Sequence, residues 1–219
     1  MTADQSGRQA FIRQMAGLGV DVSRETSDRL QILVDALERW QPKINLVSRA
    51  TLADVWRRHV LDSAQAMPLI PQQAETLLDL GSGAGFPGLV LAALAPHLQV
   101  TLVESDARKA AFLGEASRLM ALKNVPSIRI GRIEALPSIQ PDVLTARALA
   151  PLGQLLTWAA RHRGDTTICL FHKGKGWQAE LTEAMKNWDI PVHPSNSQTD
   201  LDAVILRIGR FSPRQAGVP

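Results

Sequence analysis

Apolar residues recur at helical spacing in three segments before residue 70, and this pattern predicts an N-terminal helical unit. Between Ser23 and Trp40 the apolar residues lie three or four positions apart and therefore share one face of a helix. Shorter amphipathic segments from Gly7 to Gly17 and from Thr51 to Met67 predict two further helices. Ser23 is a candidate N-cap, and we expect Pro42 to help end the middle helix.

After Pro71 short apolar runs alternate with helical patterns, as in a mostly parallel, doubly wound α/β sheet of the Rossmann-like class. The expected strands are Thr76–Leu80, Gln99–Glu104, Ser127–Ile130, Asp142–Thr145 and Thr166–Phe171, followed by a closing hairpin of Ile190–His193 and Ala203–Ile208. The expected helices between them are Pro87–Ala95, Asp106–Met120, Pro151–His162 and Gln178–Trp188.

The pattern divides the chain into a helical cap over residues 1–70, a sheet domain over 71–210 and a flexible tail over 211–219. No apolar run reaches the roughly 18 residues that a membrane helix needs, and the N-terminus has no signal-peptide core. A single cysteine, Cys169, excludes an internal disulfide. We therefore expect a cytoplasmic protein without a membrane partner. A monomer is the default expectation, and no metal site is predicted. The net charge of +3 permits a polyanionic partner but does not require one.

The glycine-rich turn after the first strand predicts a cofactor site. Asp79-Leu80-Gly81-Ser82-Gly83-Ala84-Gly85-Phe86-Pro87-Gly88 spans the junction between this strand and the next helix. Glycine lets a backbone turn tightly and approach a ligand closely. Glu104 ends the next strand, where an acidic side chain can accept hydrogen bonds from ribose hydroxyls.

Three interpretations of this turn are open: S-adenosylmethionine, a dinucleotide, or a structural turn. Residues Gly83 to Gly88 fit the dinucleotide pattern GxGxxG, but the strand ends before Gly81, so that match is shifted by two residues. Asp79 would repel a pyrophosphate, whereas it suits a cationic sulfonium and ammonium. The register and the charge favour S-adenosylmethionine.

The residues also narrow the kind of methyl transfer. Cys169 lies in an apolar strand, where an inert buried thiol is expected rather than the nucleophile that pyrimidine C5 methylation needs. Residues Ala146–Pro151, after the fourth strand, lack the Asn/Asp-Pro-Pro-aromatic tetrad of amino-group methylases of nucleobases. An acceptor that already carries a lone pair, such as guanine N7, needs no general base.

Arg147 and Lys173 at the rim of the sheet, and His59 with Asp62 on a nearby helix, are further candidate site residues. Arg147 ends the fourth strand, where it would hold a phosphate, the cofactor carboxylate or a guanine edge, or else form a surface ion pair. Lys173 begins a Lys-Gly-Lys-Gly-Trp loop that suits RNA contact, or else a solvated turn with Trp177 as an anchor in the core. His59 and Asp62 share a helix face and form either a structural pair or part of the acceptor site.

These residues together resemble the RsmG (GidB) family of bacterial 16S rRNA methyltransferases over Ser23 to Ile208. The Gly turn is common to many methylases, whereas the added Phe-Pro-Gly and the Arg-His-Val-Leu-Asp-Ser segment make the combination specific. The stretches that carry the resemblance are Trp40 with Ile44–Ser48, Arg58–Ser63, Leu78–Gly88, Glu104–Ser105, Arg132–Glu134, Ala146–Ala148 and Lys173–Gly174.

The resemblance implies a Rossmann-like methylase with an N-terminal helical cap. It implies methyl transfer from S-adenosylmethionine, with S-adenosylhomocysteine as product, to N7 of a single guanine in 16S rRNA of the small ribosomal subunit, near the decoding region. Family members often have Asp where this chain has Glu104, whose longer carboxylate should still reach a ribose. The expected cofactor-binding residues are Gly81, Ser82, Gly83, Gly85, Phe86, Glu104, Ile133, Glu134 and Arg147, and the expected catalytic or positioning residues are Arg147, Lys173 and His59.

Three rival functions share parts of this pattern. A small-molecule methylase would use the same fold and cofactor without needing a basic rim. A non-catalytic RNA-binding or ribosome-assembly factor would bind RNA but not S-adenosylmethionine, and the intact Gly turn with Glu104 argues against it. A nicotinamide oxidoreductase is disfavoured by the shifted glycine register.

Overall fold

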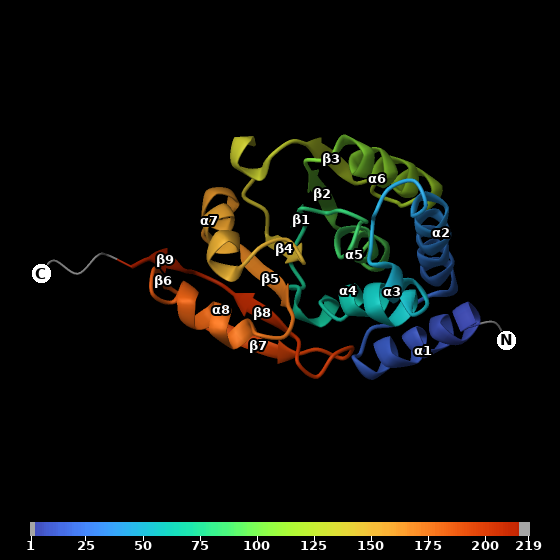
Figure 1. Ribbon diagram of the computed structural model, residues 1–219, viewed down its shortest axis with the longest axis horizontal. Coiled ribbons are helices and arrows are strands. Elements are labelled where there is room, and N and C mark those ends of the chain that lie inside the picture. Colours follow the sequence, from blue (N-terminus) through green and yellow to red (C-terminus); the bar gives the residue numbers. More distant parts are fainter. Residues whose placement is uncertain (1–2, 215–219) are drawn as a thin grey trace, which may run out of the picture.

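A seven-stranded sheet forms the centre of the computed structural model, which describes residues 3–214 (Figure 1). The strand order is β3-β2-β1-β4-β5-β8-β7, with β8 antiparallel to both of its neighbours and the other pairs parallel. The strands are β1 (Thr76–Leu80), β2 (Gln99–Glu104), β3 (Ser127–Ile130), β4 (Val143–Arg147), β5 (Ile168–Lys173), β7 (Val192–Asn196) and β8 (Val204–Ile208). The mostly parallel, doubly wound sheet and its closing hairpin are thus confirmed.

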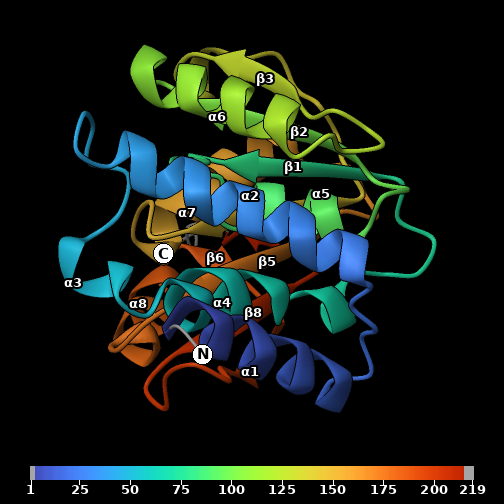
Figure 2. The same ribbon diagram turned by 90° about the vertical axis from the view of Figure 1, so that its right-hand side faces the viewer.

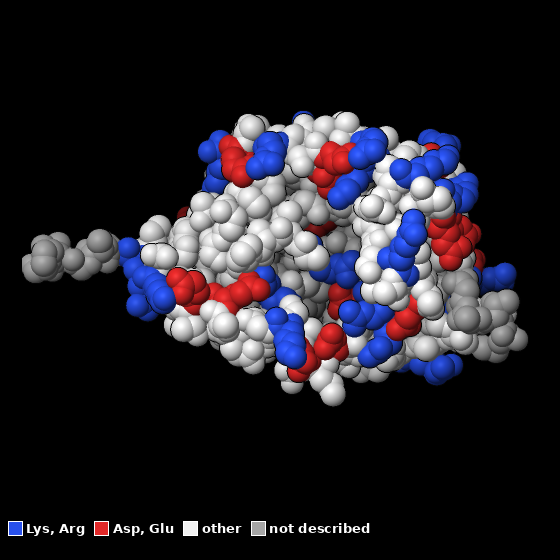
Figure 3. All heavy atoms as spheres, in the orientation of Figure 1, with Lys and Arg blue, Asp and Glu red and all other residues white. Residues whose placement is uncertain are grey.

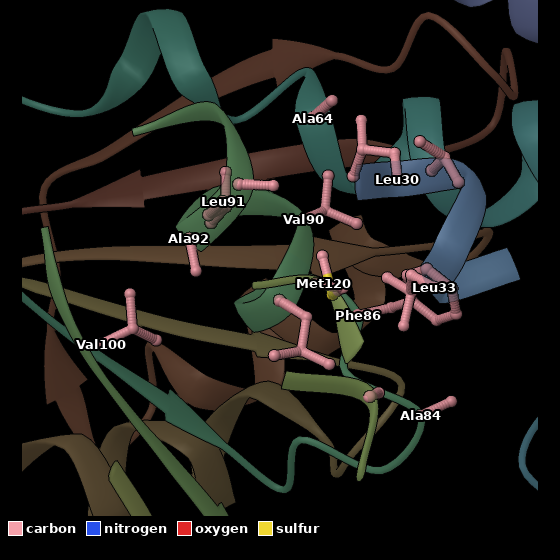
Figure 4. Close-up of a cluster of buried hydrophobic side chains, with 14 of the residues drawn as sticks. Leu30, Leu33, Ala64, Ala84, Phe86, Val90, Leu91, Ala92, Val100 and Met120 are labelled. Atoms are coloured by element: carbon pink, nitrogen blue, oxygen red, sulfur yellow. The ribbon is translucent and has the colours of Figure 1, made fainter. Parts of the chain in front are cut away.

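Helices cover both faces of the sheet, and each face has its own hydrophobic cluster. On one face α5 (Gly88–Leu94) and α6 (Ala107–Leu119) pack on the strands, and α2 (Arg24–Trp40) packs across both helices, as Figure 2 shows. On the other face lie α7 (Leu152–His162) and α8 (Trp177–Ala184). Side chains from α2, α4 (Asp62–Ala64) and α5 meet in the first cluster (Figure 4). The N-terminal helices therefore share one continuous core with the sheet.

Two helices begin at side chains that cap them, and one of these, Ser23, was predicted. Ser23 precedes α2 and its hydroxyl accepts a hydrogen bond from the backbone N–H of Thr26 at 3.0 Å. Asp106 caps α6 in the same way, accepting from the N–H groups of Arg108 and Lys109. These side chains satisfy backbone donors that have no partner within the helix.

The single helix expected over Thr51 to Met67 is wrong. The segment is divided into α3 (Arg49–Leu52), a π-helical turn η1 (Trp56–Leu61), α4, and a 3₁₀ turn η2 (Met67–Leu69). Pro68 lies in the first turn of η2 and cannot donate the backbone hydrogen bond that would continue an α-helix. The first helix, α1 (Ala3–Gly17), packs against η1.

The C-terminal region departs from expectation in two places. Helix α8 ends at Ala184, before the expected Trp188, which instead pairs in a two-stranded sheet of β6 (Trp188–Asp189) and β9 (Ser212–Pro213). Phe211 is buried and contacts the ring of Trp188. The expected flexible tail therefore does not begin at residue 211; its last part, 215–219, lies outside the described residues.

The order of the strands creates a crevice at one end of the sheet. From β1 the chain winds outward to β2 and β3, then returns to β4 beside β1 and winds outward the other way. In such sheets ligands bind outside the carboxyl ends of the strands at this switch point. The Gly turn follows β1 and Arg147 ends β4, so both lie at the crevice. Within residues 3–214, no helix has the length and apolarity to cross a membrane.

Candidate active site

The turn after β1 needs glycine because its backbone is left-handed and crowded. Gly81, Gly83 and Gly85 have φ angles of +63°, +54° and +81°. A Cβ on Gly81 would lie 2.4 Å from Leu149, and one on Gly85 would lie 2.5 Å from Leu89. A Cβ on Gly83 would meet only the carbonyl oxygen of Gly81, at an ordinary contact distance of 3.7 Å. Side chains at the first and third positions would thus displace the packing, whereas Gly83 leaves its space to a ligand.

Glu104 holds the Gly turn in place. One oxygen of its carboxylate accepts from the backbone N–H of Gly83 at 2.9 Å, and the other accepts from that of Asp106 at 2.8 Å. The side chain is 7% exposed and lies at the end of β2. Each oxygen keeps a further lone pair, so the carboxylate can accept ligand hydroxyls while it fixes the turn.

A cavity of about 450 Å³ opens over the ends of β1, β2, β3 and β4. It lies within the size range of small-molecule and cofactor pockets. Gly85 is not in its wall, because it is packed against Leu89 and only shapes the turn. The other predicted cofactor residues are brought together in its lining: Gly81, Ser82, Gly83, Phe86, Glu104, Ile133, Glu134 and Arg147.

Several residues in this wall were not predicted as site residues. Leu46 and Val47 come from the loop between α2 and α3, where the amide of Gln41 accepts from both of their N–H groups at 3.1 Å and donates to the carbonyl of Val47 at 2.8 Å. Trp158 reaches the cavity from the middle of α7, and Lys109 from α6. The Ile44–Ser48 stretch had marked the family resemblance, which is the signal that could have placed the loop here.

Asp79 does not take the position expected of it. It is fully buried, faces α5, and accepts from the hydroxyl of Thr145 at 2.7 Å. A Cβ on Gly88 would come within 2.8 Å of its second oxygen, which places the carboxyl under the start of α5 and outside the cavity wall. Burial raises the pKa of Asp79 to about 6. The expected contact between Asp79 and a bound cation is therefore wrong.

A second cavity of about 480 Å³ adjoins the first and shares Arg147, Ala148 and Leu149 with it. Its other walls come from η1 and α4, the end of β5, and the loop between β7 and β8. The candidates His59 and Lys173 line it. Figure 3 shows this face of the molecule hollowed near its centre, with basic and acidic side chains around the hollow.

Arg147 stands between the two cavities and is held by the π-helical turn. The N–H of Asp62 donates to the carbonyls of Arg57 and His59, so the carbonyl of Arg58 keeps no such partner in the turn. That carbonyl accepts instead from Nη1 of Arg147 at 3.2 Å. The same nitrogen donates to the carboxylate of Asp62 at 2.9 Å. The π-helical turn thus provides two acceptors that bind the guanidinium of Arg147, which comes from β4.

His59 completes the surroundings of Arg147. Its Nδ1 lies 2.9 Å from Nη2 of Arg147, and its Nε2 lies 2.8 Å from the hydroxyl of Thr51. The imidazole stacks on Phe86 with ring centroids 5.2 Å apart, and Cζ of Arg147 lies 5.4 Å from the centroid of the same ring. Burial and the neighbouring Arg147 charge lower the pKa of His59 to about 4. His59 and Asp62 are both bound to Arg147.

Asp62 ties η1 to the loop between β7 and β8. Besides Arg147, its carboxylate accepts from the hydroxyl of Thr199 at 2.8 Å and from the amide of Gln65 at 3.0 Å. Although burial alone would raise it, the pKa of Asp62 lies below its ordinary value because His172, the Arg147 charge and the hydroxyl of Thr199 stabilise the carboxylate. His172 in β5 places Nε2 3.0 Å from the backbone carbonyl of Asp62. Burial lowers the pKa of His172 to about 4.

Lys173 points into the fold rather than into solvent. Its Nζ forms an ion pair with Glu180 at 2.5 Å and donates to the carbonyl of Ala150 at 3.0 Å. Its exposed fraction is 9%. Trp177 packs partly buried against the second hydrophobic cluster, as the core-anchor interpretation expected. The basic side chains at the cavity mouths are instead Lys109 and Arg132 at the first and Arg58 at the second.

Comparison with known proteins places the chain in a family. The family described as GidB, rRNA small subunit methyltransferase G, matches residues 26–201. The chain belongs to this family. It is 48% identical over 196 residues to ribosomal RNA small subunit methyltransferase G of Paramagnetospirillum magneticum, covering 89% of this chain and 94% of that protein. The namesake in Rhodospirillum rubrum is 50% identical over 192 residues, covering 88% and 94%.

Solved structures support the fold of this GidB family member. An O-methyltransferase from Bacillus cereus, crystallised in complex with SAH, superposes with a TM-score of 0.55 at 13% identity, covering 92% of this chain and 97% of that one. At that identity the likeness concerns the fold alone, which is the Rossmann-like fold of S-adenosylmethionine methyltransferases.

Proposed function

We propose that this protein transfers a methyl group from S-adenosylmethionine to N7 of a single guanine in 16S rRNA of the small ribosomal subunit. The family and its named relatives support the reaction and the class of substrate. The observation that carries the proposal is a pair of adjoining cavities separated by Arg147, one of them built around the Gly turn and Glu104.

The first cavity fits the cofactor by its chemistry. Glu104 offers carboxylate lone pairs to ribose hydroxyls, and Ile133 with Trp158 provides apolar walls for an adenine, with Glu134 as a polar neighbour. Gly83 leaves the backbone accessible to the methionine part. Arg147 offers donors to its carboxylate. When bound, S-adenosylmethionine supplies an electrophilic methyl group on a sulfonium.

The second cavity fits the acceptor base. It adjoins the first through Arg147, Ala148 and Leu149, so a base held there would face a methyl donor held next door. Methyl transfer is governed by this alignment and by the exclusion of water. Neither histidine of this cavity is suited to act as a base, because Nδ1 of His59 lies against Arg147 and Nδ1 of His172 is buried from solvent. Guanine N7 brings its own lone pair and needs no base.

The test is methyl transfer from labelled S-adenosylmethionine to small ribosomal subunits that lack the modification, followed by mapping of the methylated nucleotide. We expect label at N7 of one guanine of 16S rRNA and none with Gly83→Asp, whose carboxylate would enter the first cavity. Calorimetry of cofactor binding runs alongside. Cofactor binding without transfer to rRNA would refute the substrate and favour a small-molecule acceptor. RNA binding without cofactor binding would favour an assembly factor.

We further propose that the protein works as a cytoplasmic monomer with the small subunit, or its rRNA, as partner. The basic side chains Lys109, Arg132 and Arg58 at the cavity mouths support contact with a polyanion. Sedimentation of the free protein and of its mixture with small subunits tests both points. A stable dimer, or failure to bind subunits at low salt, would refute the respective proposal.

A further inference from the structure

The hydrogen bonds of His59 fix its protonation at both ring nitrogens. A guanidinium can only donate hydrogen bonds, so the Nδ1 atom that lies 2.9 Å from Arg147 must carry a lone pair and no proton. At the other end the hydroxyl of Thr51 donates to the backbone carbonyl of Ser48 at 2.7 Å, because a carbonyl only accepts. Thr51 therefore accepts from Nε2–H of His59. Two independent contacts require the same neutral tautomer.

This arrangement leaves His59 no means of accepting a substrate proton. Its one lone pair is occupied by Arg147, and a proton placed there would face a fixed positive charge. The charged groups around the imidazole are Arg147 from β4, and Asp62 and Arg58 from its own segment. The pKa of about 4, lowered by burial and by Arg147, agrees with a ring that stays neutral.

The same contacts determine how Arg147 is presented. Of its five N–H groups, both on Nη1 are used by Asp62 and the Arg58 carbonyl, and one on Nη2 is used by His59. Within residues 3–214, the Nε–H group and the second Nη2–H group have no protein acceptor. Stacking on Phe86 fixes the plane of the imidazole that receives Arg147.

We propose, on the basis of the function proposed above, that His59 is a positioning residue. As the neutral Nε2–H tautomer between Thr51 and Arg147, it orients Arg147 so that its two remaining N–H donors face the cofactor and the acceptor base. The chain Ser48–Thr51–His59–Arg147 begins in the segment before α3 and ends between the two cavities. The π-helical turn supplies the second support through the Arg58 carbonyl.

Two amide variants separate positioning from base catalysis. The side-chain amide of Asn reaches about as far as Nδ1 of histidine, so His59→Asn keeps an acceptor for Arg147. The amide of Gln reaches about as far as Nε2, so His59→Gln keeps the contact with Thr51 and loses the acceptor at Nδ1. We expect His59→Asn, which keeps the acceptor for Arg147 but loses the Thr51 contact and the stacking on Phe86, to lower turnover by about tenfold, the scale of one lost hydrogen bond. We expect His59→Gln to lower turnover by about 100-fold, the scale of a misplaced positioning group. Thermal unfolding of both variants checks that they fold.

Nitrogen NMR of histidine-labelled protein reads the tautomer without any activity. We expect the His59 signals, identified by their loss in His59→Asn, to show a bare Nδ1 and a protonated Nε2 from about pH 8 down to about pH 5.5, below the ordinary histidine range. An Nδ1–H tautomer or an imidazolium in that range would overturn the proposal, as would a His59→Asn enzyme as impaired as His59→Gln. If the wild-type protein methylated no rRNA, the proposed function would be refuted. The tautomer measured by NMR would still show whether His59 is held as proposed.

Discussion

Replacing Arg147 by alanine should destabilise the protein as well as weaken cofactor binding. The side chains of Arg147 and Asp62 are only 16% and 18% exposed, and the variant leaves the Asp62 carboxylate without its cation. Removing one partner of a buried pair costs about 3–5 kcal/mol. Thr199 and Gln65 still donate to Asp62, so the lower limit applies. We expect Arg147→Ala to lower the free energy of unfolding by about 3 kcal/mol.

A second substitution separates the structural loss from the functional one. In Arg147→Ala/Asp62→Asn the buried charge is gone, while the amide oxygen can still accept from Thr199. We expect the double variant to recover about 2 kcal/mol of unfolding free energy relative to Arg147→Ala, within the range of coupling energies between contacting residues. Affinity for S-adenosylmethionine should not recover, because the donors of Arg147 are still missing.

Urea unfolding and calorimetric titration with S-adenosylmethionine measure the two quantities on the same four proteins of the cycle. Asp62→Asn alone is the matched control, since it keeps the Arg147 guanidinium next to a neutral acceptor. A loss below about 1 kcal/mol in Arg147→Ala would show that the pair behaves like an exposed one. Equal cofactor affinity in all four proteins would remove Arg147 from the binding site.

Three further results are expected. Gly83→Asp should abolish cofactor binding in calorimetry, because its left-handed backbone is strained by a side chain and its carboxylate would occupy the cavity; normal binding would show that this turn is not the pocket. Glu104→Gln should raise the Kd for S-adenosylmethionine about tenfold, since one of two backbone N–H groups would face an amide N–H; an unchanged Kd would contradict the anchoring role. His59 and His172 have pKa values lowered to about 4, so the unfolded chain binds their protons first, and their contribution to stability is complete above about pH 6.5 and is lost as the pH falls toward 4. Asp79, with its pKa raised to about 6, acts in the opposite direction and gains stability as the pH falls. Urea unfolding measured against pH should therefore compare two proteins: the loss of unfolding free energy between pH 6.5 and pH 4 should be about 3 kcal/mol smaller in His59→Asn than in the wild type. Identical profiles would refute the lowered pKa of His59.

The sequence predicted best what depends on neighbours along the chain. Strands β1, β2 and β3 begin and end at the predicted residues, because apolar runs between turn signals mark them locally. Which residues gather around the first cavity was also largely predictable, since its lining comes from the ends of neighbouring parallel strands. The alternation of side chains along β1 gave one signal that was not used. Leu78 and Leu80 lie on one face of the strand, so Asp79 must point to the opposite face, which α5 covers in the structure.

The remaining features depend on contacts between distant parts of the chain. The π-helical turn lies within the expected Thr51–Met67 helix. It leaves the carbonyl of Arg58 to accept a hydrogen bond from the guanidinium of Arg147, which lies 89 positions later in the sequence. The periodicity of apolar residues in a segment cannot predict a hydrogen-bond partner so far away in the sequence. Likewise, Val47 lines the cavity because the side-chain amide of Gln41 forms hydrogen bonds with the backbone of Val47 and holds the loop there. The spacing of apolar residues does not predict such a side-chain interaction.

The position of Asp62 explains how Arg147 could serve the proposed cofactor site, whose ligand would carry a positive charge. A guanidinium beside a sulfonium would weaken binding by charge repulsion unless an anion neutralised it. Asp62 lines the second cavity but not the first, so it neutralises Arg147 from the side away from the proposed cofactor. Arg147 can then present N–H donors to the cofactor carboxylate with little net positive charge. Residues of two segments therefore act together at this position. The Arg-His-Val-Leu-Asp-Ser segment supplies the carbonyl of Arg58, the imidazole of His59 and the carboxylate of Asp62, and the end of β4 supplies the guanidinium that they bind.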